Sequence, residues 1–219
     1  MNLLPETLEL LTRIGGAADG DPRHGGYRTY CGLRAQGLRD AALAALTGFV
    51  AEAAVWPLAD RFAFTRWLAE AADFERNTPL TPDPLVRDLL EPAVAAQAAQ
   101  VPADAEARML LGLFGNAVDP GTPSPLDQYR AAHALDPANP VVSEVFVRAV
   151  LRGVAYSQHE MPYLYLGAPQ EDAALLGQAL TAARREAWGK RYLGLLEERL
   201  ACARTAVTDP AQLNDGKQG

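Results

Sequence analysis

Seven prolines divide this 219-residue chain into a series of alanine- and leucine-rich stretches. The prolines that precede such stretches are Pro5, Pro57, Pro84, Pro102, Pro125, Pro140 and Pro169. Proline suits the first turn of a helix because its missing N–H would have no partner there, so each of them indicates a helix start. The 41 alanines favour the same interpretation, because alanine costs the least free energy in a helix. The sequence therefore predicts an all-α protein of several antiparallel helical hairpins, arranged as a bundle.

The segment 140–156 is rich in valine, which also suits a β-strand. Its charged residues Glu144, Arg148 and Arg152 recur every four positions. That spacing gives one narrow polar stripe on a helix and no consistent face on a strand. We therefore expect a largely buried helix.

Composition shifts predict two helical parts. An N-terminal part covers residues 1–76 and contains a glycine-rich loop at 15–32, which is either mobile or a functional lid. A C-terminal part covers residues 84–207, and a polar tail at 208–219 is expected to fray. The proline-rich segment 77–84 forms the division, because proline keeps each preceding residue out of the helical conformation. The same pattern also fits one continuous domain.

Charge and cysteine content limit the classes of partner and the cellular compartment that we expect for the protein. The formal net charge is -7, which argues against nucleic acid and anionic membranes as partners, because phosphate contacts need concentrated positive charge. No apolar run approaches the ~20 residues of a membrane span. The two cysteines, Cys31 and Cys202, lie far apart without metal-ligand spacing, and residues 1–16 have no basic leader. We expect a soluble, acidic, cytoplasmic protein with reduced thiols.

One segment resembles a tetratricopeptide repeat. Residues 129–140 read Tyr-Arg-Ala-Ala-His-Ala-Leu-Asp-Pro-Ala-Asn-Pro, which is similar to the end of that repeat's second helix, and Leu111-Gly112 is similar to the pair in its first helix. The resemblance covers about 35 residues, 103–140, which is one repeat at most, whereas such folds need roughly three. It implies a local helical hairpin and not a full superhelix.

Motifs for catalysis and for cofactors are not found. The sequence contains no glycine-rich phosphate loop with its lysine, dinucleotide fingerprint, His-Glu-x-x-His helix, nucleophile elbow or paired-cysteine motif. Asp19-Gly20-Asp21 resembles the start of a calcium loop but lacks the later acidic ligands. We expect no metal, no cofactor and no catalytic residue.

The strongest polar group lies where the valine-rich helix is expected to end. It consists of Tyr156, His159, Glu160, Tyr163 and Tyr165. Tyrosine and histidine offer a large contact area with few rotatable bonds, so the group could form a binding surface, or His159 and Glu160 an acid/base pair. The structural alternative is that His159 and Glu160 satisfy the carbonyl end of the helix while the tyrosine rings pack inward.

Three weaker candidates have stronger structural explanations. His24, with Arg23 and Arg28, could contact an anion, but a solvated loop explains these residues better. His133 is expected on a helix face. A basic cluster with interleaved aromatic residues could hold nucleic acid, but nearby glutamates favour a solvated helix junction. Its members are Arg184, Arg185, Trp188, Lys190, Arg191 and Tyr192.

The functional expectation is a protein–protein interaction module, an adaptor, inhibitor or immunity-type protein whose partner is another protein chain. Two alternatives remain open at this point. One is a hydrolase or transferase with a site around His159, Glu160 and the neighbouring tyrosines. The other is a small-ligand binder that uses the 15–32 loop.

Overall fold

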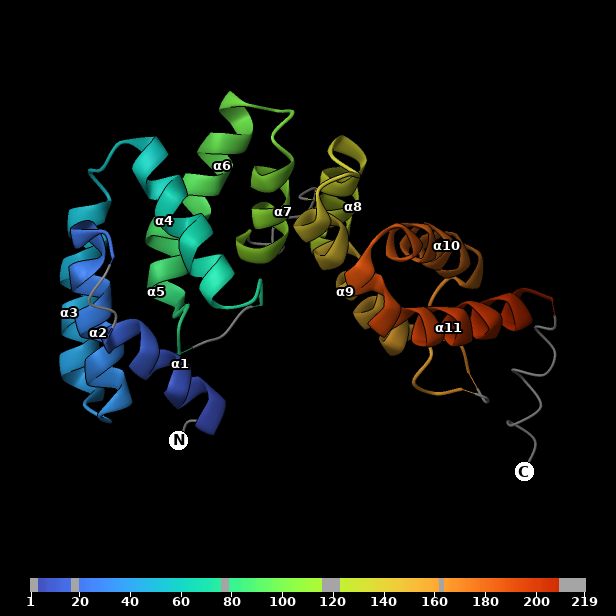
Figure 1. Ribbon diagram of the computed structural model, residues 1–219, viewed down its shortest axis with the longest axis horizontal. Helices are drawn as coiled ribbons and strands as arrows, with labels where there is room; N and C mark the ends of the chain where they lie inside the picture. Colours follow the sequence, from blue (N-terminus) through green and yellow to red (C-terminus); the bar gives the residue numbers. More distant parts are fainter. Residues whose placement is uncertain (1–3, 17–19, 76–78, 116–122, 162–163, 209–219) are drawn as a thin grey trace. The chain divides into compact units, whose positions relative to one another are not determined.

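The described part of the chain is helical throughout. The computed structural model describes residues 4–16, 20–75, 79–115, 123–161 and 164–208. Within these ranges every regular element is a helix and no strand occurs (Figure 1), which confirms the all-α class. No helix of those ranges is long and apolar enough to cross a membrane.

The chain forms two compact units. The first comprises Met1–Ala103 with Leu113–Asp119, and the second comprises Asp104–Gly112 with Pro120–Gly219. Helix α7 (Ala105–Phe114) therefore contributes residues to both. The predicted tail beyond residue 208 lies outside the described residues.

The first unit is built from short helices in close succession. In chain order they are α1 (Pro5–Gly16), η1 (Pro22–His24), α2 (Gly25–Ala35), α3 (Arg39–Ala53), α4 (Leu58–Ala71), α5 (Asp83–Leu85), η2 (Val86–Leu90) and α6 (Glu91–Gln100). Helix α2 packs against both α1 and α3, and α4 packs against α6. Six of the seven prolines expected to mark helix starts lie within the first two residues of a helix or directly before it, and Pro102 lies three residues before α7.

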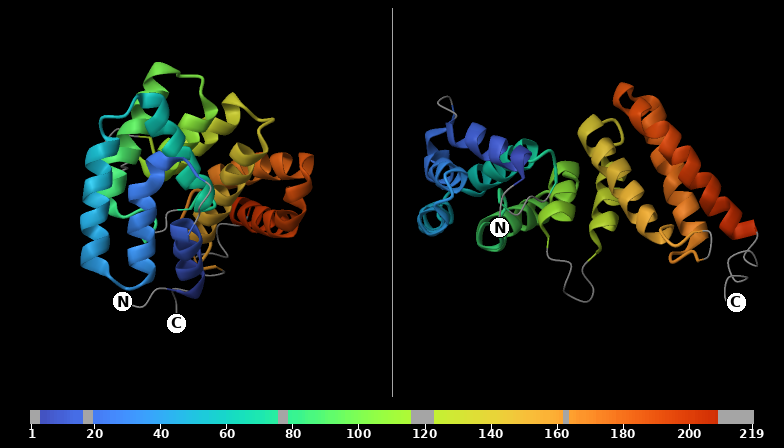
Figure 2. Two further views of the ribbon diagram at one scale, coloured as in Figure 1. Left: turned by 60° about the vertical axis from the view of Figure 1, so that its left-hand side comes forward. Right: turned by 90° about the horizontal axis from the view of Figure 1, so that it is seen from below.

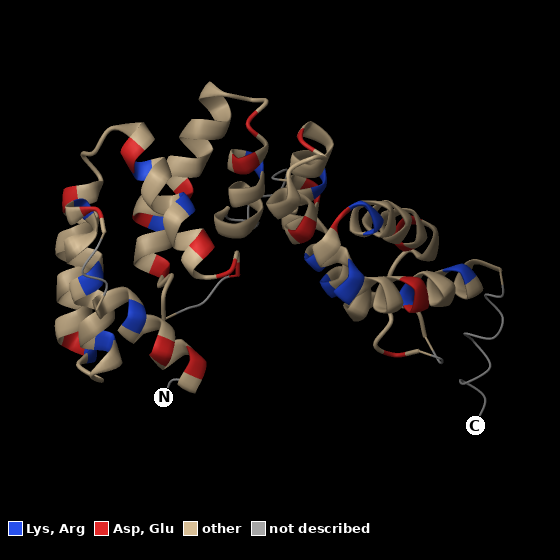
Figure 3. Ribbon diagram, in the orientation of Figure 1, with Lys and Arg blue, Asp and Glu red and all other residues tan. Residues whose placement is uncertain are grey.

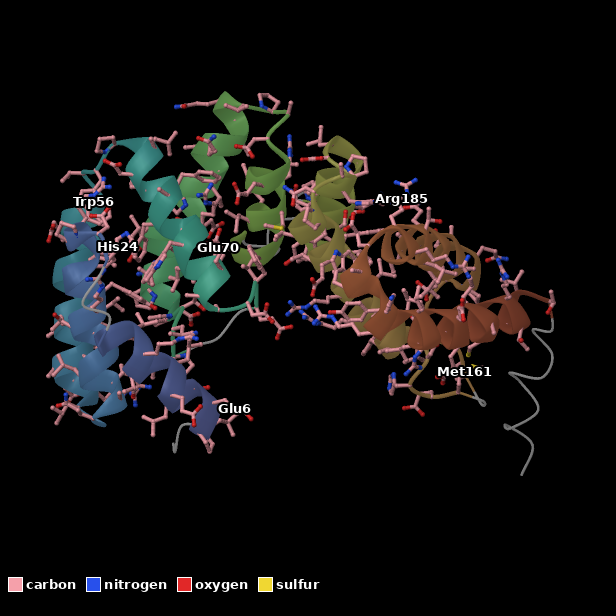
Figure 4. All side chains as sticks on the ribbon, viewed as in Figure 1. Glu6, His24, Trp56, Glu70, Met161 and Arg185 are labelled. Atoms are coloured by element: carbon pink, nitrogen blue, oxygen red, sulfur yellow. The ribbon has the colours of Figure 1, made fainter. Side chains whose placement is uncertain are left out.

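An aromatic cluster forms the core of this unit. Phe64 is fully buried, and its ring centroid lies 5.5 Å from that of Tyr27 and 5.0 Å from that of Phe49. The ring of His24, labelled in Figure 4, lies 4.5 Å from that of Trp67. Rings at such separations contribute packing energy beyond the area that they bury. Helices α2, α3 and α4 are joined by these contacts.

The proline-rich segment 77–84 does not separate the two units. It lies within the first unit, where the Tyr27 hydroxyl donates to the Leu80 carbonyl at 2.6 Å and the Tyr30 hydroxyl donates to the Pro79 carbonyl at 2.5 Å. Leu80 is fully buried. Proline leaves the carbonyl groups here without helical partners, and the two tyrosines satisfy them. A turn-forming composition is therefore compatible with a buried core segment.

The glycine-rich loop expected at 15–32 is corrected by the structure. Helix α2 begins at Gly25, so the second half of that segment is helical, while residues 17–19 lie outside the described residues. The buried face of α2 consists of Tyr27, Tyr30 and Cys31. These residues recur at the helical spacing of three and four positions. That spacing was present in the sequence, and the many glycines obscured it.

The glycines serve close packing between helices. A Cβ atom on Gly15 would lie 2.8 Å from the backbone nitrogen of Gly32, so α1 approaches the backbone of α2 at this point. A Cβ atom on Gly26 would lie 3.0 Å from the Cβ of Phe49 on α3. Glycine is suited to positions where a second backbone comes this close.

The chain passes Pro92 by way of a single wide turn. In η2, a π-helical turn, the Glu91 N–H donates to the Val86 carbonyl five residues earlier. Proline has no N–H, and its ring crowds the carbonyl four residues before it, which here is that of Asp88. The wide turn opens the helix just before Pro92, and α6 then continues.

The second unit is a row of longer helices. They are α8 (Pro125–Leu135), α9 (Pro140–Ser157), α10 (Pro169–Arg185), η3 (Ala187–Gly189) and α11 (Lys190–Thr208). Helix α8 packs on α9, α9 on α10, and α10 on α11. Figure 2 shows α10 and α11 side by side along most of their length.

Helix α9 confirms the helical interpretation of the valine-rich segment. The Asn139 side chain accepts hydrogen bonds from the N–H groups of Val141 and Val142 and so caps its first turn. Eight of its residues are buried. Their contacts with α8 and α10 make α9 the central helix of this unit.

The close contact between α1 and α2 can be tested with two alanine substitutions. Gly15→Ala should lower the free energy of unfolding by about 1–3 kcal/mol, because its new methyl group meets backbone that cannot move aside. Gly32→Ala is the matched control, since a Cβ there has no neighbour within 4 Å. It should raise the free energy of unfolding by about 0.4–1 kcal/mol. Urea unfolding of both variants measures the difference, and equal effects would contradict the contact.

Stability should fall in mild acid because of His24. Burial lowers the pKa of this ring, so the unfolded chain takes up protons at a higher pH than the folded one. The contribution of His24 is therefore present above about pH 6.5 and is lost as the pH falls below it. His24→Phe should weaken the decrease in urea midpoint between about pH 7.5 and about pH 5. An unchanged decrease would show that His24 is readily protonated in the folded protein.

Candidate functional site

The candidate site is the turn that follows α9. We call residues 156–166 the exit segment; residues 162–163, and with them Tyr163, lie outside the described residues. Met161, labelled in Figure 4, belongs to this segment. The Leu166 N–H donates to the Ser157 carbonyl at 2.8 Å, so the chain folds back on the end of α9.

Two buried side chains anchor the exit segment. Gln158 is 3% exposed, and its Nε2 donates to the Arg199 carbonyl on α11 at 3.0 Å. The Tyr165 side chain is also buried, and its hydroxyl donates to Asp172 Oδ2 on α10 at 2.7 Å. The Tyr165 hydroxyl also lies 3.3 Å from Gln158 Nε2. The segment is thereby fixed to both α10 and α11.

The electrostatics of Tyr165 agree with this anchoring role. Burial, followed by the hydrogen bond to Asp172, raises the pKa of its hydroxyl. A neutral hydroxyl donates to the carboxylate, whereas a phenolate would place two negative charges together. Tyr165 therefore acts as an internal support and offers no free surface.

Apolar side chains of the same segment face solvent. Tyr156 is 71% exposed, Leu164 is 41% exposed and Leu166 is 42% exposed. Large apolar side chains gain free energy by burial, so these three would gain from contact with a partner surface.

His159 and Glu160 also lie on the surface, and they contact each other. His159 Nδ1 lies 2.6 Å from the Tyr156 carbonyl oxygen, and His159 Nε2 lies 3.0 Å from Glu160 Oε1. The rings of Tyr156 and His159 are 5.2 Å apart. His159 thus satisfies the carbonyl end of α9, as the structural alternative expects, and it also positions Tyr156.

The five residues singled out in the sequence therefore separate. Tyr156, His159 and Glu160 are brought together on the surface, Tyr165 lies inside, and Tyr163 is not described. Sequence reasoning missed Gln158, Leu164 and Leu166. Leucines on either side of Tyr165 were a usable signal, because neighbours in an extended segment point to opposite sides.

The other candidates from the sequence lie in structural contacts. Arg23 pairs with Asp21 and Asp60, both at 2.5 Å, beside the half-buried His24. His133 on α8 stacks on Phe146 with ring centroids 4.9 Å apart.

The basic cluster of the last two helices is engaged with acidic residues. Arg184 pairs with Glu197 at 2.8 Å, and Arg191 pairs with Glu144 of α9. Figure 3 shows basic residues at the start of α11 and both signs of charge together near its middle. These pairs agree with the solvated helix junction expected from the sequence.

A hollow of about 370 Å³ lies in the first unit, where α1 and the end of α4 provide its lining. Its charged residues are Glu6, Glu9, Arg13 and Asp73. Among the described residues, no group of three or more His, Cys, Asp or Glu side chains is placed to hold a metal ion. Cys31 and Cys202 are both free.

The different roles of the two tyrosines can be tested by removing their hydroxyls. Tyr165→Phe should lower the free energy of unfolding by about 1–2 kcal/mol, because it removes the donor to Asp172 inside the protein. Tyr156→Phe, the matched control, should change it by less than about 0.5 kcal/mol, as for an ordinary surface substitution. Urea unfolding checks both values. Similar effects of the two changes would contradict the buried anchor.

Comparison with known proteins found no relative of this chain. No protein-family model, no curated protein and no solved structure matches the chain.

Proposed function

We propose that this protein is a protein–protein interaction module, an adaptor, inhibitor or immunity-type protein, that binds another protein chain through the exit segment. The single observation that carries the proposal is the exposed Tyr156, with Leu164 and Leu166, on a turn held by buried hydrogen bonds. The free cysteines Cys31 and Cys202 support a reducing, cytoplasmic setting.

Anchoring matters because binding has an ordering cost. A side chain that must be immobilised on binding loses about 0.5–1.5 kcal/mol of the interaction energy. Tyr156 is restricted by its contact with His159, and the turn that carries the two leucines is restricted by Gln158 and Tyr165. The segment is therefore organised before the partner arrives.

The chemistry of the segment indicates the kind of partner surface. A tyrosine ring fits an apolar pocket with a polar group at its base for the hydroxyl, and exposed leucines of the same segment fit apolar surface. Tyrosine is among the residues that most often dominate the binding energy of protein interfaces. We infer that Tyr156 occupies such a pocket on the partner chain, with Leu164 and Leu166 at its rim.

A tetratricopeptide-like element forms part of the proposal. Gly112 and Tyr129 belong to the residues that carry the resemblance, and a Cβ on Gly112 would lie 2.6 Å from Tyr129 Cε1. This close fit supports a hairpin of α7 and α8. The packing of α8, α9, α10 and α11 on successive neighbours is also typical of helical repeats, which commonly bind proteins.

The function is tested by capturing partners from a lysate of the native cells with the immobilised full chain. The wild-type chain should retain one protein in a stoichiometric amount, and Tyr156→Ser should lose at least ~90% of it, as expected for the loss of about 1.4 kcal/mol or more at a central contact. Val55→Ser is the matched control, because Val55 is 84% exposed and lies outside the segment.

Stability measurements separate binding from folding. Both substitutions should leave the urea midpoint nearly unchanged, because both side chains are exposed. Equal capture by Tyr156→Ser and wild type, or no retained partner, would reject the exit segment as the binding surface.

A further inference from the structure

Helix α1 has a second face beside the one that it buries. Its buried residues are Thr7, Leu11 and Ile14, and the helix packs on α2. Four other residues of α1 line the hollow of about 370 Å³ in the first unit. They are Glu6, Glu9, Leu10 and Arg13. Their spacing of three and four positions places them in one stripe along the helix, and Glu6, labelled in Figure 4, lies at its N-terminal end.

The charged groups of this stripe are not paired inside the protein. Among the described residues, no hydrogen bond or ion pair joins the side chain of Glu6, Glu9 or Arg13 to another group. Glu9 stands four positions before Arg13, which is the order that favours an ion pair on a helix surface. Both residues instead line the hollow separately. Charges of both signs are thus free to meet a ligand there.

The opposite wall of the hollow comes from the end of α4. Ala71 and Ala72 supply small apolar groups, and Asp73 adds a third carboxylate. Asp73 has φ 52°, in the left-handed region that glycine usually occupies at a helix end. A residue with a side chain costs free energy in this conformation, and such residues cluster at binding sites. With Leu10 of α1, the alanines give the hollow an apolar part beside its charges.

Size and charge together define the class of ligand. Pockets for small molecules usually have volumes of about 300–1,000 Å³, so the hollow is large enough for a small one. The three carboxylates select cationic groups, whereas the Arg13 guanidinium selects a carboxylate. Glu6 and Arg13 are seven residues apart, which is about 10 Å along the helix axis. A ligand that meets both must carry opposite charges at the two ends of a short aliphatic chain.

We propose that this hollow binds a basic amino acid, a small molecule with an ammonium group at one end of an aliphatic chain and a carboxylate at the other. The side-chain ammonium lies among Glu6, Glu9 and Asp73, the carboxylate lies against Arg13, and the methylene groups cover Leu10 and the alanines. The site lies outside the exit segment and does not rest on the proposed function. Its charged residues are exposed, so each contact resembles a surface ion pair, and we expect a Kd of about 0.1–10 mM.

The site can be tested with three small molecules that differ at one end. The labelled full chain is titrated at constant ionic strength with lysine, with cadaverine, which lacks the carboxylate, and with norleucine, which lacks the side-chain ammonium. Lysine should cause saturable shifts of the backbone amide NMR signals of α1 and of residues 71–73. Cadaverine and norleucine should each bind about twofold to fivefold more weakly, as expected for the loss of one exposed ion pair.

Two variants assign the two ends of the ligand. Glu9→Gln should weaken lysine and cadaverine about twofold to fivefold and leave norleucine unchanged, because only the first two carry the side-chain ammonium. Arg13→Gln should weaken lysine and norleucine by a similar factor and should not weaken cadaverine. Glu52→Gln is the matched control, since Glu52 is an exposed carboxylate of α3 outside the hollow. All three changes are on the surface and should leave the urea midpoint nearly unchanged.

Three outcomes would overturn the proposal. One is that lysine causes no saturable shift up to about 50 mM, well above the expected Kd. Another is equal weakening by Glu9→Gln and Glu52→Gln, which would show general attraction of cations to an acidic protein. The third is cadaverine binding as tightly as lysine, which would leave Arg13 without a role and reject the amino acid as the ligand.

Discussion

A buried amide, that of Gln158, is the group on which the candidate site depends. An amide removed from water costs free energy unless its donors and acceptor are paired. Gln158 finds partners in the Arg199 backbone and side chain on α11 and in the Tyr165 hydroxyl. These bonds draw the chain after α9 back to the protein and turn Tyr165 inward. The leucines on either side of Tyr165 are left outside as a consequence.

In the first unit, buried polar groups also hold a segment of chain between helices, but there they bind backbone carbonyls of a buried segment. Tyr27 and Tyr30 lie among aromatic and apolar neighbours, but each sends its hydroxyl to a carbonyl of the proline-rich segment. Prolines restrict the backbone of that segment, and the tyrosines satisfy its polar groups. In both units buried tyrosine hydroxyls hold a stretch of chain between helices: Tyr27 and Tyr30 do so from α2, whereas Tyr165 belongs to the stretch itself.

The sequence predicted the helices well, because the signals for them are local. Pro125, Pro140 and Pro169 begin the helices expected of them, and the charge spacing of Glu144, Arg148 and Arg152 correctly indicated that the valine-rich segment is helical.

Two features could not be predicted from the sequence: the helix within residues 15–32 and the different exposures of two tyrosines. Both depend on contacts with residues distant along the chain. Nothing in the composition of residues 15–32 says that Gly15 meets the backbone of Gly32, so the glycines suggested a loop. Tyr156 and Tyr165 are the same residue type in the same short segment. Their exposures differ because Asp172 and Gln158 are available to only one of them.

The wide turn at Val86–Leu90 bears on how this chain can change in length. Buried residues recur here every four positions, at Val86, Leu90, Val94 and Ala98. In a regular α-helix, a four-residue repeat advances by about 40° beyond each full turn, so such a row would wind away from the core. The π-helical turn takes up part of that advance and keeps the row aligned. Extra length is thus accommodated locally in η2, whereas a residue inserted into the regular part of α6 would rotate everything after it by about 100° relative to α4.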